Sequence, residues 1–179
     1  VETIADRIRS AMEGRTEVLP RILFTAHGLP KKVIAAGDPY QWQVERTADA
    51  IVQAVDIPGL DWIVCYQSRV GPLEWIQPYT SDILKVAGDE RKPVIVVPIG
   101  FTSEHSETLV ELDIEYRELA EQAGVPEYIR IKTVGADAAF ISGLAKLVAS
   151  TLSHDETLSS DGSGCQCPEN YQRCAFRVS

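Results

Sequence analysis

The stretch that decides the fold is residues 93–123, PVIVVPIGFTSEHSETLVELDIEYRELAEQA. Its first part, Pro93–Ile99, is an apolar run without alternation, which predicts a strand covered on both faces. Its second part, Ser106–Ala123, repeats apolar residues at helical spacing and therefore predicts an amphipathic helix. A buried strand followed by such a helix is one βα unit, and successive βα units build a parallel sheet.

The same alternation extends in both directions along the chain. Further strands are predicted at Arg21–Ala26, Asp61–Tyr66 and Tyr128–Val134. Helices are predicted from Val1 onward and at Pro39–Val55, Thr80–Ala87 and Asp137–Leu152. We therefore expect an α/β fold: a four-stranded parallel sheet flanked by helices, Rossmann-like, in one domain over residues 1–152.

Two features set the limits of this domain. The chain opens on Val1, directly inside a helical pattern, which we interpret as a fragment of a longer protein. After Leu152, residues 153–164 (SHDETLSSDGSG) are polar and rich in Ser and Gly, so they predict a linker. Residues 165–179 then form a short extension that contains most of the cysteines.

Composition and charge exclude several classes of function. The 179 residues are 45% hydrophobic and 24% charged, which suits a globular domain with a sizeable core. With 26 acidic and 17 basic residues the net charge is −9, which argues against nucleic acid as a partner. No apolar run approaches the ~20 residues that span a bilayer. No GxGxxG or Walker loop is present, so no motif supports nucleotide binding.

Candidate functional residues follow the predicted strands. In open parallel sheets, ligands bind beyond the carboxyl ends of the strands. The residues at these exits are His27 after the first strand, Gln67 and Ser68 with Trp75 after the second, and Phe101, His105 and Glu107 after the third. For His27 the alternative is a core histidine bonded to the backbone, and for the aromatic residues it is ordinary packing.

A row of acidic residues continues from these exits. Glu107, Glu111 and Glu115 are spaced four residues apart, so they stack on one face of the predicted helix without a lysine at matching spacing. Like charges at this spacing destabilise a helix by about 0.2–0.5 kcal/mol per pair. Two interpretations stay open at this point: a solvated acidic face, or a path along which a hydrated divalent cation or a proton moves.

Three segments together resemble the ferrochelatase family. They are FTAHGLP (24–30) followed by GDPY (37–40), YQSRVGP (66–72) followed by Trp75, and PIGFTSEHSETLVELDIEY (98–116). The third segment is the most specific, and the resemblance covers residues 1–152 in the same order. It corresponds to the second half of the family's chain, whose two Rossmann-like halves enclose a porphyrin cleft.

The resemblance implies roles for individual residues. His27 is similar to the family's histidine that binds the metal and accepts pyrrole protons, and Glu107 is similar to its partner carboxylate. Glu111 and Glu115 resemble an acidic metal conduit. The residues that resemble the lining of the porphyrin cleft are Gln67, Ser68, Trp75, Phe101 and His105. A histidine suits proton abstraction around pH 7, and histidine with carboxylate suits Fe²⁺.

The activity that the resemblance implies is insertion of Fe²⁺ into protoporphyrin IX in heme biosynthesis, a lyase reaction. Coproporphyrin III as the substrate stays open, as does a fragment that binds a tetrapyrrole, a metal or a second copy of itself without turnover. A chelatase for sirohydrochlorin fits the segment at residues 98–116 less well. We expect the chain alone to be inactive without the missing N-terminal half, and the whole protein to be cytoplasmic, at the membrane surface or free of it.

The cysteines are concentrated near the end of the chain. Cys165, Cys167 and Cys174 form a C-x-C-x₆-C pattern, whereas Cys65 lies in an apolar run and is expected in the core. This distribution is unlike a disulfide framework and indicates a reducing compartment and metal chemistry. The resemblance to bacterial family members implies a [2Fe–2S] cluster whose fourth ligand lies outside this chain. A Zn²⁺ site is the alternative. Cysteine thiolates bind both zinc and iron–sulfur clusters, and both kinds of site use four ligands, of which this extension supplies three.

Overall fold

The computed structural model describes residues 1–15, 18–153, 158 and 164–178. Its centre is a sheet of four parallel strands, which confirms the α/β fold predicted from the sequence. The strands are β1 (Arg21–His27), β2 (Trp62–Gln67), β3 (Val94–Pro98) and β4 (Tyr128–Arg130), in the order β2-β1-β3-β4. The strand order therefore reverses between β1 and β3. Ligands of open parallel sheets bind at such a reversal.

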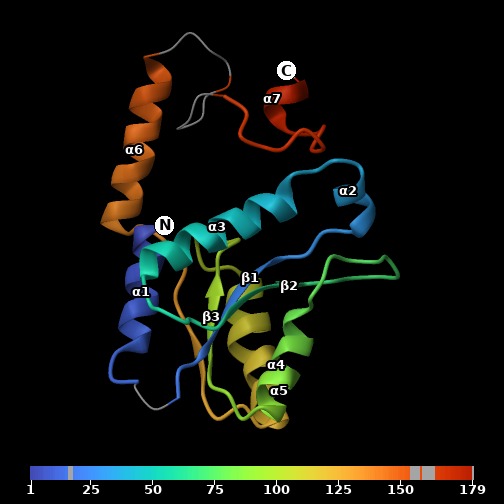
Figure 1. Cartoon of the computed structure of the whole chain (residues 1–179), viewed down its shortest axis with the longest axis vertical. Coiled ribbons are helices and arrows are strands. Elements are labelled where there is room, and N and C mark those ends of the chain that lie inside the picture. The colour runs from blue at the N-terminus through green and yellow to red at the C-terminus, as the bar shows by residue number, and fades with distance from the viewer. Residues whose placement is uncertain (16–17, 154–157, 159–163, 179) are drawn as a thin grey trace.

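Helices cover both faces of this sheet (Figure 1). On one face, α1 (Glu2–Met12) and α3 (Tyr40–Val55) pack on apolar side chains of β1 and β3. On the other face, α4 (Thr80–Asp89) and α5 (Tyr116–Ala123) pack on side chains from β1, β2 and β3. Because both faces are covered, the strands carry apolar residues without alternation.

Cys65 lies in the second of these layers, as the sequence predicted. Its side chain is fully buried, and the Thr80 hydroxyl lies 3.3 Å from its sulfur. Burial raises the pKa of the Cys65 thiol to about 12, although the hydrogen bond with Thr80 acts in the opposite direction. Cys65 is therefore a neutral core side chain, set apart from the other cysteines.

The fourth strand is shorter than the predicted Tyr128–Val134. It ends at Arg130, and only the Ile131 N–H continues the ladder. The next carbonyl groups accept hydrogen bonds from elsewhere: the Arg7 guanidinium of α1 donates to the oxygens of residues 132–134. Because β4 is an edge strand, no outer neighbour holds these carbonyls in a strand once a side chain binds them.

The helix predicted over Ser106–Ala123 is two helices of different kind. η1 (Glu107–Glu115) is a π-helix, and the α-helix α5 continues directly from it. At their junction the Tyr116 N–H donates to the Glu111 carbonyl five residues earlier, which is the π-helical bond. The apolar spacing of the sequence predicted the helix but not its wider turns.

The last long helix, α6 (Ala138–Leu152), stands apart from the sheet (Figure 1). It begins at the N-cap Asp137, whose side chain accepts the Ala139 N–H at 3.0 Å. None of its residues is buried, and it exposes Ile141, Leu144, Leu147, Val148 and Leu152. Within the described residues, no helix combines the length and the apolar character needed to cross a membrane.

The cysteine-bearing extension folds back on the loop before α3. The sequence did not predict two short helices in these segments, α2 (Lys31–Ala35) before that loop and α7 (Ala175–Val178) at the end of the extension. The Arg173 N–H donates to the Gly37 carbonyl at 3.0 Å. Gly37 has a φ of +90°, and a Cβ there would lie 3.0 Å from the Gln172 nitrogen, so glycine permits both the turn and the contact. Most of the predicted linker at residues 153–164 lies outside the described residues.

Candidate active site

The carboxyl ends of the strands bring the predicted residues to one edge of the sheet. His27 is the last residue of β1 and lies beside Gln67, the last residue of β2. Glu107 is the first residue of η1, which follows β3. The site therefore lies where the strand order reverses, as the rule for parallel sheets predicts.

His27 and Glu107 form the central contact of the site. Nδ1 of His27 lies 2.9 Å from Oε2 of Glu107. Because a carboxylate only accepts hydrogen bonds, the neutral ring donates from Nδ1 and keeps a lone pair on Nε2. The Nε2 atom has no hydrogen-bond partner in the described part of the chain, and the His27 side chain is 41% exposed. A ring held in this way can accept a proton or bind a metal ion through Nε2.

Neighbouring residues fix the position of His27. The Tyr40 hydroxyl donates to the His27 carbonyl at 2.9 Å, and the Trp75 ring meets the imidazole edge-on with 6.3 Å between centroids. Burial and the negative charge of Glu107 raise the pKa of Tyr40, so its hydroxyl remains a donor. Gly28 allows this packing, because a Cβ there would lie 3.3 Å from the Trp75 ring. Trp75 thus lies buried against His27.

Glu111 is held by the end of β2. Its Oε1 accepts a hydrogen bond from the Ser68 N–H at 2.8 Å. Its Oε2 accepts one from the Ser68 hydroxyl and another, at 3.2 Å, from the Gln67 side-chain amide. Ser68 has a φ of 63°, a left-handed conformation that residues other than glycine seldom adopt. This conformation directs its N–H at the carboxylate. Gln67 is almost fully buried beneath the site.

These residues surround an open cavity of about 480 Å³. It is lined by His27, Ser68, Arg69, Val70, Ser106, Glu107, Val110, Glu111 and Glu115. The three glutamates thus share one wall, although η1 is a π-helix. The Arg69 guanidinium lies over the Tyr79 ring, 4.2 Å from its centroid. Among the described residues, no lysine or arginine forms an ion pair with these glutamates.

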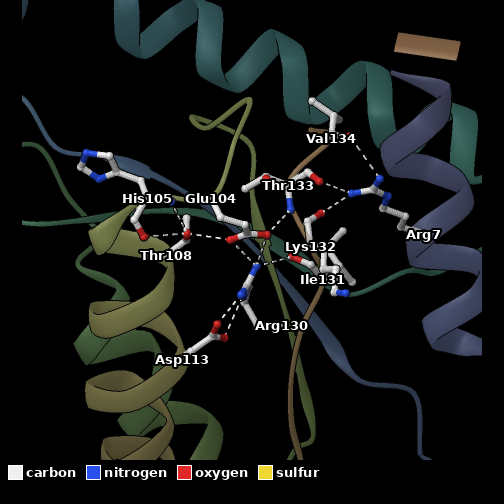
Figure 2. A network of polar contacts seen from close by, with 10 residues as sticks. All are labelled: Arg7, Glu104, His105, Thr108, Asp113, Arg130, Ile131, Lys132, Thr133 and Val134. Atoms are coloured by element: carbon white, nitrogen blue, oxygen red, sulfur yellow. Dashed lines mark hydrogen bonds and ion pairs between the residues drawn. The ribbon is translucent and has the colours of Figure 1, made fainter. Parts of the chain in front are cut away.

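A second group of charges lies away from the cavity, between η1 and β4 (Figure 2). Arg130 binds Glu104 through Nη1, at 2.8 Å and 2.9 Å, and Asp113 through Nε at 2.8 Å and through Nη2. Glu104 also accepts the Thr108 hydroxyl at 2.7 Å and the Thr133 N–H at 3.0 Å. Burial alone would raise the pKa of Glu104, but these hydrogen bonds and the Arg130 charge lower it to about 2.

Phe101 and His105 form a pair of their own outside the cavity. Their rings are stacked with 5.9 Å between centroids, and the His105 ring points away from the Arg130 network (Figure 2). Nδ1 of His105 accepts the Glu107 N–H at 3.3 Å, which links the pair to the first turn of η1. Their role in binding a porphyrin stays a prediction.

The three cysteines of the extension converge. The sulfur atoms of Cys165, Cys167 and Cys174 all lie within 4.8 Å of one another, and Cys167 and Cys174 are buried. The Gln43 side-chain amide of α3 lies 3.8 Å from the Cys167 sulfur. Three converging thiols match the donor set of a zinc or iron–sulfur site in which one ligand comes from elsewhere.

Comparison with known proteins identifies the family of this chain. The sequence model of the ferrochelatase family matches residues 1–152. The chain belongs to the ferrochelatase family. It is 51% identical over 178 residues to a ferrochelatase of Caulobacter vibrioides (strain NA1000 / CB15N), covering 99% of this chain and 51% of the relative. It is 46% identical to ferrochelatases of Pelagibacter ubique and Rickettsia conorii, covering 86% and 88% of this chain and 45% and 46% of those relatives. The chain thus spans about half the length of these curated relatives.

The structure adds residues to the site that the sequence did not single out. Arg69, Val70, Ser106 and Val110 line the cavity; they lie within the segments that resemble the family, but the sequence assigned them no individual role. The GDPY segment resembles the family, but nothing in its sequence indicates that the Tyr40 hydroxyl binds the His27 carbonyl. Arg130 could have been singled out, because an arginine in a short apolar strand needs acidic partners.

Proposed function

We propose that this chain forms one side of a ferrochelatase active site, which inserts Fe²⁺ into protoporphyrin IX to give protoheme. The observation that supports this most is the contact between His27 and Glu107 on a cavity that continues along Glu111 and Glu115. The family match supports metal insertion into a porphyrin as the type of reaction.

The chemistry requires Fe²⁺ to lose its water ligands and two pyrrole nitrogens to lose their protons. Nε2 of His27 accepts a pyrrole proton, and the imidazolium that results is stabilised by Glu107, 2.9 Å from Nδ1. The carboxylates of Glu111 and Glu115 offer oxygen ligands and negative charge along one wall, which favours a hydrated cation or a released proton there. Iron enters as a substrate, and both protons leave to solvent.

The experiment uses a protein restored to the length of the relatives, with Zn²⁺ insertion followed by porphyrin fluorescence. His27→Ala is expected to lower kcat by at least ~100-fold, the usual contribution of a positioned acid or base. Lys85→Ala, at an exposed residue of α4 outside the cavity lining, serves as the control and is expected to keep its turnover. Unchanged turnover in His27→Ala would contradict the assignment of His27 as the residue that accepts the pyrrole proton.

The same assay distinguishes protoporphyrin IX from coproporphyrin III as the substrate. Protoporphyrin IX is expected to give the higher kcat/KM, and a higher value for coproporphyrin III would replace it as the substrate. We expect the 179-residue chain alone to show no turnover, because one wall of a cleft does not hold a macrocycle in place. Turnover by this chain at the rate of the restored protein would contradict that expectation.

The cysteines of the extension fit a [2Fe–2S] cluster with a fourth ligand from the rest of the protein. Cys165, Cys167 and Cys174 would hold it, and when bound it would supply a structural or electron-accepting centre away from the His27 cavity. Aerobically purified protein of full relative length is expected to be coloured and to contain iron and sulfide, both lost in Cys174→Ser. A colourless protein with one zinc per chain would establish the Zn²⁺ alternative.

We also propose that the half of the relatives' length not spanned here packs on α6. Its exposed apolar side chains lie together on one helix, which is typical of an interaction surface, and the groove beside it includes Val1, Glu2 and Leu144. The α6 amides are expected to exchange hydrogen more slowly in the restored protein than in this chain. Equal exchange would contradict the proposal, and protection that rises with the concentration of this chain alone would indicate a homodimer instead. We also propose a reducing cytoplasmic location, because three of the four cysteines converge like metal ligands and are not distributed like a disulfide framework.

A further inference from the structure

Five carboxylates lie between residues 104 and 115, and the fold divides them into two groups. Glu107, Glu111 and Glu115 line the cavity. Glu104 and Asp113 face β4, where both bind the same arginine, Arg130. Helical spacing groups Glu107, Glu111 and Glu115 on one face, but the sequence alone does not show that Arg130 binds the other two carboxylates.

Arg130 has an almost fully buried side chain, which is unusual for an arginine. Its side chain is only 7% exposed, and its guanidinium binds a carboxylate on each side. A planar guanidinium can hold two carboxylates at once in fixed geometry, which an ammonium group cannot do. The strand that carries Arg130 is paired with β3, so the guanidinium has a rigid base.

The Arg130 contacts hold η1 at two points. Asp113 belongs to the second half of η1, and Glu104 precedes its first turn. The Thr108 hydroxyl donates to Glu104 at 2.7 Å and lies 2.8 Å from the His105 N–H, which donates to it. The first turn is thereby fixed around Thr108, the residue next to Glu107.

We propose that Arg130 is a positioning residue: by holding Glu104 and Asp113 against β4, it sets the rotation of η1 that directs Glu107 to His27. The proposal rests on the proposed function, in which the His27–Glu107 contact handles a metal and a proton. It adds a second consequence. Glu104 and Asp113 are occupied by Arg130, so within residues 104–115 Glu107, Glu111 and Glu115 are the carboxylates left to face a metal.

A matched control exists at the opposite end of the sheet. Arg21 also binds two carboxylates, Asp61 at 3.1 Å and Glu90 at 2.9 Å, and its side chain is 17% exposed. It lies at the start of β1, whereas His27 is at the end of the same strand. Arg21→Lys therefore removes a comparable ion-pair geometry without touching η1.

The experiment compares Arg130→Lys with Arg21→Lys in the 179-residue chain, after urea denaturation has measured the stability of each. The first readout is the tautomer of His27, from long-range ¹H–¹⁵N NMR correlations at a pH where the ring is neutral. Wild type and Arg21→Lys are expected to show the Nδ1–H form, and Arg130→Lys a mixture of both forms.

The second readout is broadening of the His27 ring signals by Mn²⁺, a metal that prefers oxygen and nitrogen ligands over thiols. Arg130→Lys is expected to need about tenfold more Mn²⁺ than wild type.

The outcomes separate this proposal from the proposed function. An Nδ1–H tautomer that persists in Arg130→Lys, or equal changes in both lysine variants, would overturn the positioning role. If wild type shows the Nδ1–H form and Arg130→Lys loses it, but Mn²⁺ leaves His27 sharp in wild type, the positioning role stands and the metal-handling role fails.

Discussion

Two helices of this chain, η1 and α6, reverse the usual relation between composition and burial. η1 carries four acidic residues in nine, whereas Lys146 is the only charged residue of α6. Yet η1 buries Thr108 and Leu112 completely, and α6 buries none of its residues. The difference lies in their neighbours, because β4 and the end of β2 bind the polar groups of η1, whereas α6 packs mainly on α1. Apolar composition therefore stabilises a helix only where a complementary surface is present.

The largest loss of stability is expected when Leu112, the fully buried leucine of η1, is replaced. Leu112→Ala is expected to lower the free energy of unfolding by about 3 kcal/mol, because it leaves a cavity in a fully packed layer. Urea denaturation followed by circular dichroism measures it. A loss below about 1 kcal/mol would show that η1 is not packed as tightly as its burial indicates.

The hydroxyl of Tyr128 tests how β4 supports the π-helix. It donates to the Leu112 carbonyl at 2.7 Å, in a buried setting. Tyr128→Phe leaves that carbonyl without its partner and is expected to cost about 1.5–2 kcal/mol of unfolding free energy. Tyr79→Phe, at a tyrosine near the cavity that is only partly buried, is the control and is expected to cost less. Equal losses would argue against a special role for the Tyr128 hydroxyl.

Acid should release the contact that holds the start of η1. The pKa of Glu104 is lowered from 4.5 to about 2, so its stabilising effect is complete above about pH 4.5 and disappears as the pH falls toward 2. Protonation of Glu104 leaves Arg130 paired with Asp113 alone. With its partial exposure discounted, the loss is expected to be about 1 kcal/mol, measured by urea denaturation across this pH range. Glu104→Gln should remove this part of the pH dependence, and an unchanged profile would contradict the assignment.

The smallest effect is expected on α6. Leu144 is 42% exposed, so Leu144→Ala in the 179-residue chain should change the free energy of unfolding by less than about 0.5 kcal/mol. The same leucine-to-alanine change at Leu112 provides the comparison. A loss similar to that of Leu112→Ala would mean that α6 is already buried in this chain in solution.

The sequence predicted the sheet well because its signals are local. Runs such as VIVVP and RILFTA bury both faces, and the helices between them force parallel strands. It failed at Lys132–Val134, where the predicted strand leaves the sheet because Arg7, distant in sequence, binds these carbonyls. It also failed to distinguish a π-helix from an α-helix, since both place apolar residues on one side.

For the candidate site, the sequence alone determined which residues lie at the strand ends. The rule for parallel sheets predicted that His27 and Glu107 lie at one edge of the sheet. The spacing of the glutamates predicted that Glu107, Glu111 and Glu115 share one face of the helix at that edge. Only the tertiary structure decided which carboxylates face the cavity. Glu107, Glu111 and Glu115 face it because Ser68 and His27 bind two of them from one side, and Arg130 holds Glu104 and Asp113 on the other. Spacing fixes the face of a helix, but the groups packed against it fix its rotation.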